Sequence, residues 1–156
     1  MQSYDPSLCS AYRLALVHGI IGPKEVEAFI NELLVRSETL DDALLTAADA
    51  HADSVADLTT ALTSLSTKAE PERTSGFFMA IAERALVAYP DLADAIAAAL
   101  YSMAIEDIRP AGEAGREMWR LQDELDLATS GHHGDRASII NRLKVLLKNN
   151  ASPPDA

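Results

Sequence analysis

The chain has 156 residues, of which 48% are hydrophobic, and it carries a formal net charge of −11 with a sequence pI near 4.6. This length suits one domain with its own core, and the hydrophobic fraction is too high for a disordered acidic segment. The excess of negative charge argues against binding to nucleic acid or to an anionic membrane, and it permits a basic protein partner.

The acidic residues are concentrated in the first part of the chain. Residues 1–66 contain ten Asp or Glu and three Lys or Arg, a balance of −7, whereas residues 67–110 balance at −3 and residues 111–156 at −1. We therefore expect the first helices to form the most negative surface of the protein.

The cysteine content and the hydropathy of the chain give information about its cellular compartment. The single cysteine, Cys9, cannot form a disulfide within the chain and has apolar neighbours, so we expect it to be buried in the core. Residues 1–5 lack the basic segment and apolar run of a secretory signal, and the longest apolar run, residues 95–101, is too short to span a bilayer. These features favour a cytoplasmic protein without membrane contact.

Helical periodicity runs through the chain, whereas strand alternation and hairpin turn signals are absent. A first helix is expected to begin with Ser7 as its N-cap and to end at Gly19, which tolerates a left-handed backbone. Pro23 suits the first position of a second helix. The apolar positions of this second helix recur at helical spacing: Val26, Phe29, Ile30, Leu33 and Leu34.

The next stretch, residues 39–65, admits two interpretations. Thr39 and Asp42 resemble a capping box, after which apolar residues recur in steps of four and three, as one long helix would require. Ser54 offers a second start signal. We favour two helices with a break near residues 52–54.

In the second half, residues 67–76 are predicted to form a loop because they are mostly polar and include proline and glycine. A helix then runs to Pro90. Residues 91–107 are predicted to form a helix whose stretch 93–100 is apolar almost all round, which is typical of a central position. A turn at residues 109–112 precedes a helix with Met118, Leu121 and Leu125 on one face, and Asp135 caps a last helix.

These elements predict the fold class. We expect an all-α protein, a compact bundle of seven or eight short helices in a single domain over residues 1–148, with residues 149–156 as a flexible C-terminal tail. No pattern returns at the period of roughly 34 to 47 residues that known helical solenoids show. The core is predicted to include Phe29, Ile30, Leu33, Leu58, Leu62, Ile81, Ile96, Leu100, Leu121, Leu125, Leu143 and Leu146.

No arrangement of residues predicts catalysis. The chain lacks a glycine-rich phosphate loop, a nucleophile elbow and a paired-histidine metal motif. His132 and His133 are neighbours in a loop, where they define no ligand spacing, and we interpret them as part of a turn and helix cap. His51 is interpreted as a core or helix-break residue, and His18 as stabilised by the C-terminal end of the first helix. We expect no catalytic residue, cofactor or metal ligand.

The acidic residues between positions 24 and 57 are the candidates for contact with a partner. Asp49, Asp53 and Asp57 would align on one continuous helix. A solvated polar face is the simplest interpretation of these acids, and a docking surface for a basic protein is the functional one. The predicted contact residues are Glu25, Glu32, Asp41, Asp42, Asp49 and Asp53. Trp119, beside the apolar stripe of its helix, is either a half-buried core edge or a further anchor for a partner.

Two stretches carry a resemblance to known proteins. Residues 12–26 (YRLALVHGIIGPKEV) and residues 118–127 (MWRLQDELDL) resemble small acidic all-helical bacterial proteins of uncharacterised function, some of which look like immunity proteins of toxin systems. The resemblance spans most of residues 8–147 and brings no catalytic or ligand residue with it. It implies a protein-binding module that neutralises a toxin.

The excess of acidic residues, the small size and the lack of catalytic motifs favour a binding module that is not an enzyme. Its expected partner is a protein with a basic surface. The most specific form of this interpretation is an immunity protein. The alternative is a structural or adaptor helical bundle that self-associates as a homo-oligomer. Neither interpretation involves nucleic acid or a membrane.

Overall fold

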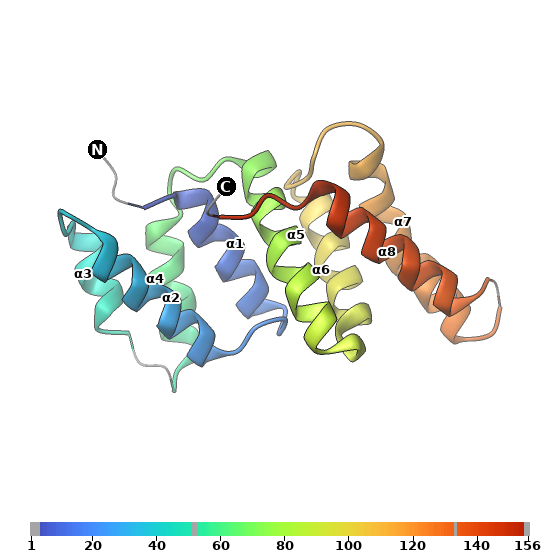
Figure 1. Cartoon of the computed structure of the whole chain (residues 1–156), viewed down its shortest axis with the longest axis horizontal. Coiled ribbons are helices and arrows are strands. Elements are labelled where there is room, and N and C mark those ends of the chain that lie inside the picture. The colour runs from blue at the N-terminus through green and yellow to red at the C-terminus, as the bar shows by residue number, and fades with distance from the viewer. Residues whose placement is uncertain (1–3, 51–52, 133, 155–156) are drawn as a thin grey trace.

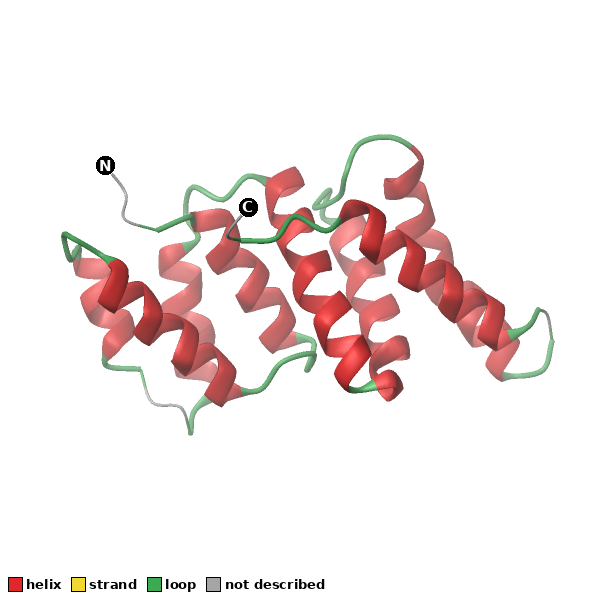
Figure 2. Ribbon diagram, in the orientation of Figure 1, coloured by secondary structure: helices red, strands yellow, loops and turns green. Residues whose placement is uncertain are grey.

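The computed structural model describes residues 4–50, 53–132 and 134–154, and within these ranges it contains helices and no strand (Figure 2). The elements in chain order are α1 (Pro6–Val17), α2 (Pro23–Arg36), α3 (Asp42–Ala48), α4 (Val55–Leu65), α5 (Pro71–Ala88), a short 3-10 helix η1 (Pro90–Leu92), α6 (Ala93–Ile105), α7 (Glu113–Thr129) and α8 (Arg136–Asn150). The expected all-α bundle is confirmed.

The helices lie in two layers. In Figure 1, α1, α2, α5 and α8 are nearer the viewer, and α3, α4, α6 and α7 lie behind them. Helices α1 to α4 form one end of the elongated molecule, and α5 to α8 form the other. The main packing between the two ends is α1 against α5, while α5 also packs on α8, and α7 packs on both α6 and α8.

The core follows the predicted apolar faces. Eleven of the twelve expected core residues are buried, and Leu33 is partly buried against the same cluster. Helix α6 buries Ala93, Ile96, Ala97, Ala99, Leu100, Met103 and Ala104, as its nearly uniform apolar sequence indicated. Its alanines leave room for the close approach of α7.

The first helix begins differently from the prediction. Asp5, not Ser7, is the N-cap: its Oδ1 accepts a hydrogen bond from the Ser7 backbone N–H at 2.9 Å, and Pro6 takes the first helical position. Ser7 is buried, and its Oγ accepts a hydrogen bond from the Glu70 backbone N–H at 2.8 Å. The predicted end is confirmed, because Gly19 has a φ of +72°.

Residues 39–65 form two helices, as favoured. Helix α3 begins two residues later than expected, because Asp41, not Thr39, caps it by accepting a hydrogen bond from the Leu44 N–H at 2.8 Å. Ser54 caps α4 by accepting a hydrogen bond from the Asp57 N–H at 3.2 Å. The predicted roles of His51 and Ala52 lie outside the described residues.

Several boundaries in the second half also differ, and α6 is two residues shorter at each end than the helix predicted over residues 91–107. The predicted loop at residues 67–76 is shorter, because α5 begins at Pro71, and Thr74, Ser75 and Gly76 are buried within it. Short polar side chains and glycine are typical of loops, but here their small size lets neighbouring segments pack closely against α5. Helix α8 continues to Asn150, two residues beyond the predicted end, and Ser152 then donates a backbone hydrogen bond to the Gly76 carbonyl at 3.0 Å.

Candidate functional site

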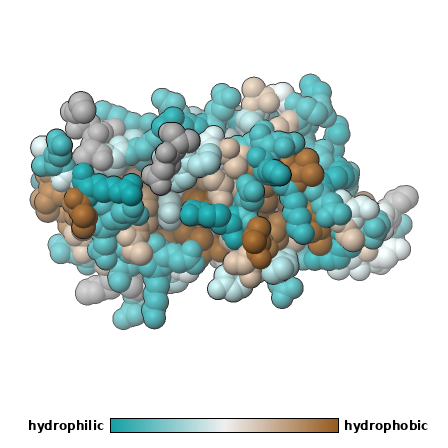
Figure 3. Space-filling view, in the orientation of Figure 1, coloured by the Kyte–Doolittle hydropathy of each residue, from teal (hydrophilic) through white to brown (hydrophobic). Residues whose placement is uncertain are grey.

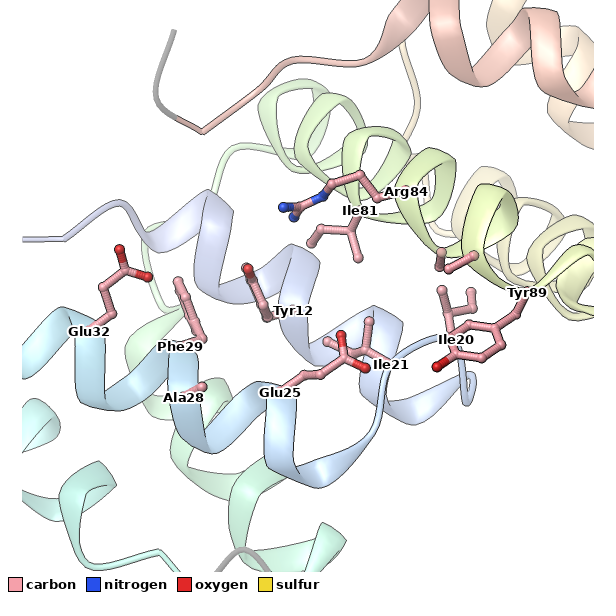
Figure 4. Close-up of a pocket in the computed structure, with 12 residues that line it drawn as sticks. Tyr12, Ile20, Ile21, Glu25, Ala28, Phe29, Glu32, Ile81, Arg84 and Tyr89 are labelled. Atoms are coloured by element: carbon pink, nitrogen blue, oxygen red, sulfur yellow. The ribbon is translucent and has the colours of Figure 1, made fainter.

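A cavity of about 390 Å³ lies between α2 and α5, with α1 beneath it (Figure 4). We call it the α2–α5 groove. Helices α2 and α5 each pack elsewhere, α2 on α3 and α4, and α5 on α1 and α8, and they do not pack closely on one another. The groove is lined by Tyr12, Ile20, Ile21, Glu25, Ala28, Phe29, Glu32, Ile81, Arg84, Ala85, Ala88 and Tyr89.

The floor of the groove is apolar, and its side chains are held in place by packing. Tyr12 of α1 stacks on Phe29 of α2, with ring centroids 3.8 Å apart and planes 3° from parallel. Ile20 and Ile21 are buried in the turn between these helices, and Ile81 of α5 is buried on the other side. Figure 3 shows hydrophobic residues in the middle of this face of the molecule, flanked by hydrophilic ones.

Helix α2 presents one consistent face to the groove. Glu25, Ala28, Phe29 and Glu32 are spaced at i, i+3, i+4 and i+7, which places them on one side of a helix. Phe29 is buried, whereas the two glutamates are exposed at the groove's edge. Glu25 also accepts a hydrogen bond from the Gly22 N–H at 3.5 Å, and Glu32 forms an ion pair with Arg36 at 2.6 Å.

The opposite wall carries a cation and a phenol. Arg84 of α5 reaches towards Tyr12, and Tyr89, which ends α5 and is 66% exposed, faces Glu25 across the groove (Figure 4). Burial raises the pKa of the Tyr12 hydroxyl, against the lowering effect of its hydrogen bond with Arg84. The groove thus combines an apolar floor with two carboxylates on one wall and a guanidinium on the other.

The structure brings together only Glu25 and Glu32 among the predicted contact residues. Asp41 and Asp42 lie at the start of α3, where Asp41 is occupied as a cap and also accepts a hydrogen bond from the Tyr4 hydroxyl at 3.1 Å. Asp42 is exposed in the first turn, as expected. The capping role of Asp41 was missed because Thr39, two residues earlier, is also a suitable N-cap residue.

Asp49, Asp53 and Asp57 do not form the acidic row that one continuous helix would have given. Asp49 follows the last residue of α3, Asp53 lies in the turn before α4, and Asp57 lies in the first turn of α4. Because α3 and α4 are separate helices, the three aspartates do not share the helical register that would align their side chains.

Trp119 belongs to α7, which lies at the opposite end of the molecule from α3 (Figure 1). Its side chain is 37% exposed and meets Tyr101 of α6 edge-on, with ring centroids 5.4 Å apart. This contact explains its half-buried position. Its role as an anchor for a partner stays a prediction.

Outside the groove, the described cysteine and histidine side chains do not form a chemical site. Cys9 is fully buried, and burial raises the pKa of its thiol to about 12, so it is far from thiolate formation at neutral pH. Burial lowers the pKa of His18 at the end of α1, although Glu106 acts in the opposite direction. Among the described residues, no three His, Cys, Asp or Glu side chains are grouped so that they could hold a metal ion. His133 lies outside the described residues.

Three residues of the groove were missed by sequence reasoning. Tyr12, Arg84 and Tyr89 carried no signal of a site, because the groove arises from how α2 and α5 flank α1. Only the helical spacing of Glu25, Phe29 and Glu32 could have indicated a mixed apolar and acidic face.

No helix within the described ranges is both long and apolar enough to cross a bilayer. Comparison of the chain with protein-family models, with curated proteins and with solved structures gives no match.

Proposed function

We propose that this protein is a binding module that contacts a basic surface of a partner protein through the α2–α5 groove and the acidic residues near it. The observation that carries this proposal is the position of Glu25 and Glu32 on one edge of an apolar cavity. An apolar floor beside exposed carboxylates provides both the contact area and the charge that a basic partner would match.

The charge distribution supports the same partner. The part of the chain that supplies α1 to α4, residues 1–66, carries a balance of −7. A negative surface of this kind speeds the encounter with a basic partner, and added salt reduces that effect. We therefore propose an association rate that falls as ionic strength rises.

The most specific form of this proposal is an immunity protein that neutralises a toxin. A toxin-like reading frame immediately beside the gene would support it, and co-expression of that frame with and without this protein would test protection directly. Growth that is equally inhibited in both cases would contradict the immunity role.

A second candidate is a self-associating adaptor, and the partly exposed ring of Trp119 beside Tyr101 favours it. Sedimentation of the purified protein over a concentration series separates the two candidates. A homo-oligomer that dissociates when Trp119→Ser is introduced would favour the adaptor. A protein that is monomeric at all concentrations would exclude the adaptor.

The direct test of the groove uses two variants of equal charge. E25Q/E32Q removes both carboxylates from the groove, and glutamine at position 25 can still accept the Gly22 hydrogen bond. E27Q/E38Q removes two exposed carboxylates that do not line the groove. Partner proteins captured by the wild type are identified, and their association rates with all three proteins are measured at low and high salt.

We expect E25Q/E32Q to slow association more than E27Q/E38Q does. Equal rates for both variants would contradict a role for the groove, even if a partner is captured. Asp42→Lys tests the acidic surface beyond the groove, whereas reversal of Asp41 would also remove the cap of α3.

A further inference from the structure

We infer that the segment bound in the α2–α5 groove is a basic amphipathic helix that lies along α1. This inference rests on the proposed function and names the kind of partner segment that the groove fits.

The groove extends beyond the first cavity. A second cavity of about 570 Å³ continues past the turn between α1 and α2 and past the end of α5. The two cavities share Ile20, Ile21, Glu25, Ala88 and Tyr89 in their linings. A continuous, open channel of this shape suits an elongated segment better than a compact small molecule.

The walls of this channel are helices. Helix α1 packs on α4 and α5, and α2 flanks it on the other side without closing against α5. On the face of α1 that borders the groove, Tyr12 is partly buried and stacks on Phe29. A helix that enters such a groove contacts it with apolar residues at i, i+3, i+4 and i+7.

The acidic edge sets the spacing of the partner's basic residues. Glu25 and Glu32 are separated by seven residues, or roughly 10 Å along the axis of α2. Two Lys or Arg residues seven apart on a bound helix would lie the same distance apart and could pair with both carboxylates. Arg84 on the opposite wall favours an acidic or amide side chain on the other flank of that helix.

The charge of the channel favours this occupant over an acidic or neutral helix. Glu25 and Glu32 lie on the α2 wall and Asp91 lines the continuation, while Arg84 is the basic residue in the linings of the two cavities. The lining is thus net negative, and the partner segment must be net positive to match it.

The probe is a fluorescein-labelled synthetic peptide of about 18 residues, with leucines at i, i+3, i+4 and i+7 and a lysine pair seven residues apart on one flank. A matched peptide has the same composition but a lysine pair five residues apart, which places one lysine on the other side of the helix. Binding is measured by anisotropy, and helix formation by circular dichroism.

We expect the first peptide to bind with a gain in helicity and the matched peptide to bind more weakly. E25Q/E32Q should weaken binding of the first peptide roughly fivefold, the size expected for two exposed ion pairs, and E27Q/E38Q should leave it unchanged. Ala28 is exposed on the groove side of α2, so Ala28→Trp should block the groove and abolish binding without disturbing the core.

No binding of the first peptide, equal binding of the two peptides, or equal effects of the two glutamine variants would overturn the helix inference. If a captured partner protein still depends on Glu25 and Glu32 while the peptide does not bind, the proposed function stands and only the helical occupant is wrong. If neither depends on these residues, both proposals fail.

Discussion

Tyr12 and Phe29 lie face to face, with ring centroids 3.8 Å apart, and this stack joins α1 to α2 at the floor of the groove. The two helices otherwise share few contacts, because α2 packs mainly on α3 and α4. The stack therefore fixes where the acidic edge of the groove lies relative to its floor.

Phe29→Ala should lower the free energy of unfolding by about 3–5 kcal/mol, because it removes a buried ring and leaves a cavity. Tyr12→Phe keeps both rings and should leave stability near that of the wild type. Chemical denaturation of both variants checks this expectation. A small loss for Phe29→Ala would mean that α2 is held without the stack.

Gly76 and Ser152 are a second pair with a testable consequence. A methyl group added at Gly76 would lie 2.7 Å from the Ser152 Oγ, so the Ser152 side chain would have to shift. Alanine within a helix otherwise gains about 0.5–1 kcal/mol over glycine. We expect Gly76→Ala to be stabilising in a Ser152→Gly background and to lose that gain in the wild type.

The measurement is a double-mutant cycle of the four proteins in urea. Additive effects of the two substitutions would show that Ser152 does not restrict position 76.

Arg142 on α8 bridges two carboxylates of α7. Its guanidinium pairs with Glu117 at 2.5 Å and also with Glu124, and both carboxylates raise the pKa of Arg142. The arginine side chain is 45% exposed, so each pair should contribute only about 0.2–1 kcal/mol. Arg142→Ala should therefore destabilise the protein much less than Leu143→Ala, which removes a fully buried side chain at about 2–5 kcal/mol.

Salt separates the two effects further. In thermal or urea unfolding, the effect of Arg142→Ala should shrink at high ionic strength, whereas the effect of Leu143→Ala should persist. Equal losses of stability for Arg142→Ala and Leu143→Ala would show that the ion pairs of Arg142 hold α7 and α8 together far more strongly than exposed ion pairs usually do.

Cys9 should make the protein less stable in alkali. The pKa of its thiol is raised from 9.0 to about 12, chiefly by burial, so the unfolded chain loses this proton before the folded protein does. Its contribution to stability is therefore complete below pH 9 and is lost as the pH rises towards 12. The difference in unfolding free energy between the wild type and Cys9→Ala should shrink over this range, measured in urea at successive pH values. A difference that stays constant with pH would show that the thiol does not ionise on unfolding.

Periodic apolar residues predicted the fold well where a helix buries one face. The cleanest case is α2, in which Phe29 and Ile30 are buried as expected. Helix starts were less predictable where two caps compete. Asp5 and Asp41 cap α1 and α3 in place of the nearby Ser7 and Thr39, because the choice depends on which backbone N–H each oxygen can reach.

The groove was largely unpredictable from sequence. Glu25 and Glu32 were identified as acidic contact residues, but Tyr12, Arg84 and Tyr89 come from other helices and meet them only after α2 and α5 flank α1. Sequence spacing describes one helix at a time, whereas a groove depends on how helices are placed relative to one another.

Helix α5 has a consequence for how the molecule opens. It packs on α1 at one end of the protein and on α8 at the other. Arg73 of α5 donates a hydrogen bond to the Asp5 carboxylate, and the Gly76 carbonyl of α5 accepts one from the Ser152 N–H. Neither end can lose its structure without exposing a face of α5, so local opening at one end weakens the other. Slow amide hydrogen exchange in α1, α5 and α8 should therefore occur in one shared step, and the protein should unfold as a single cooperative unit despite its two visible halves.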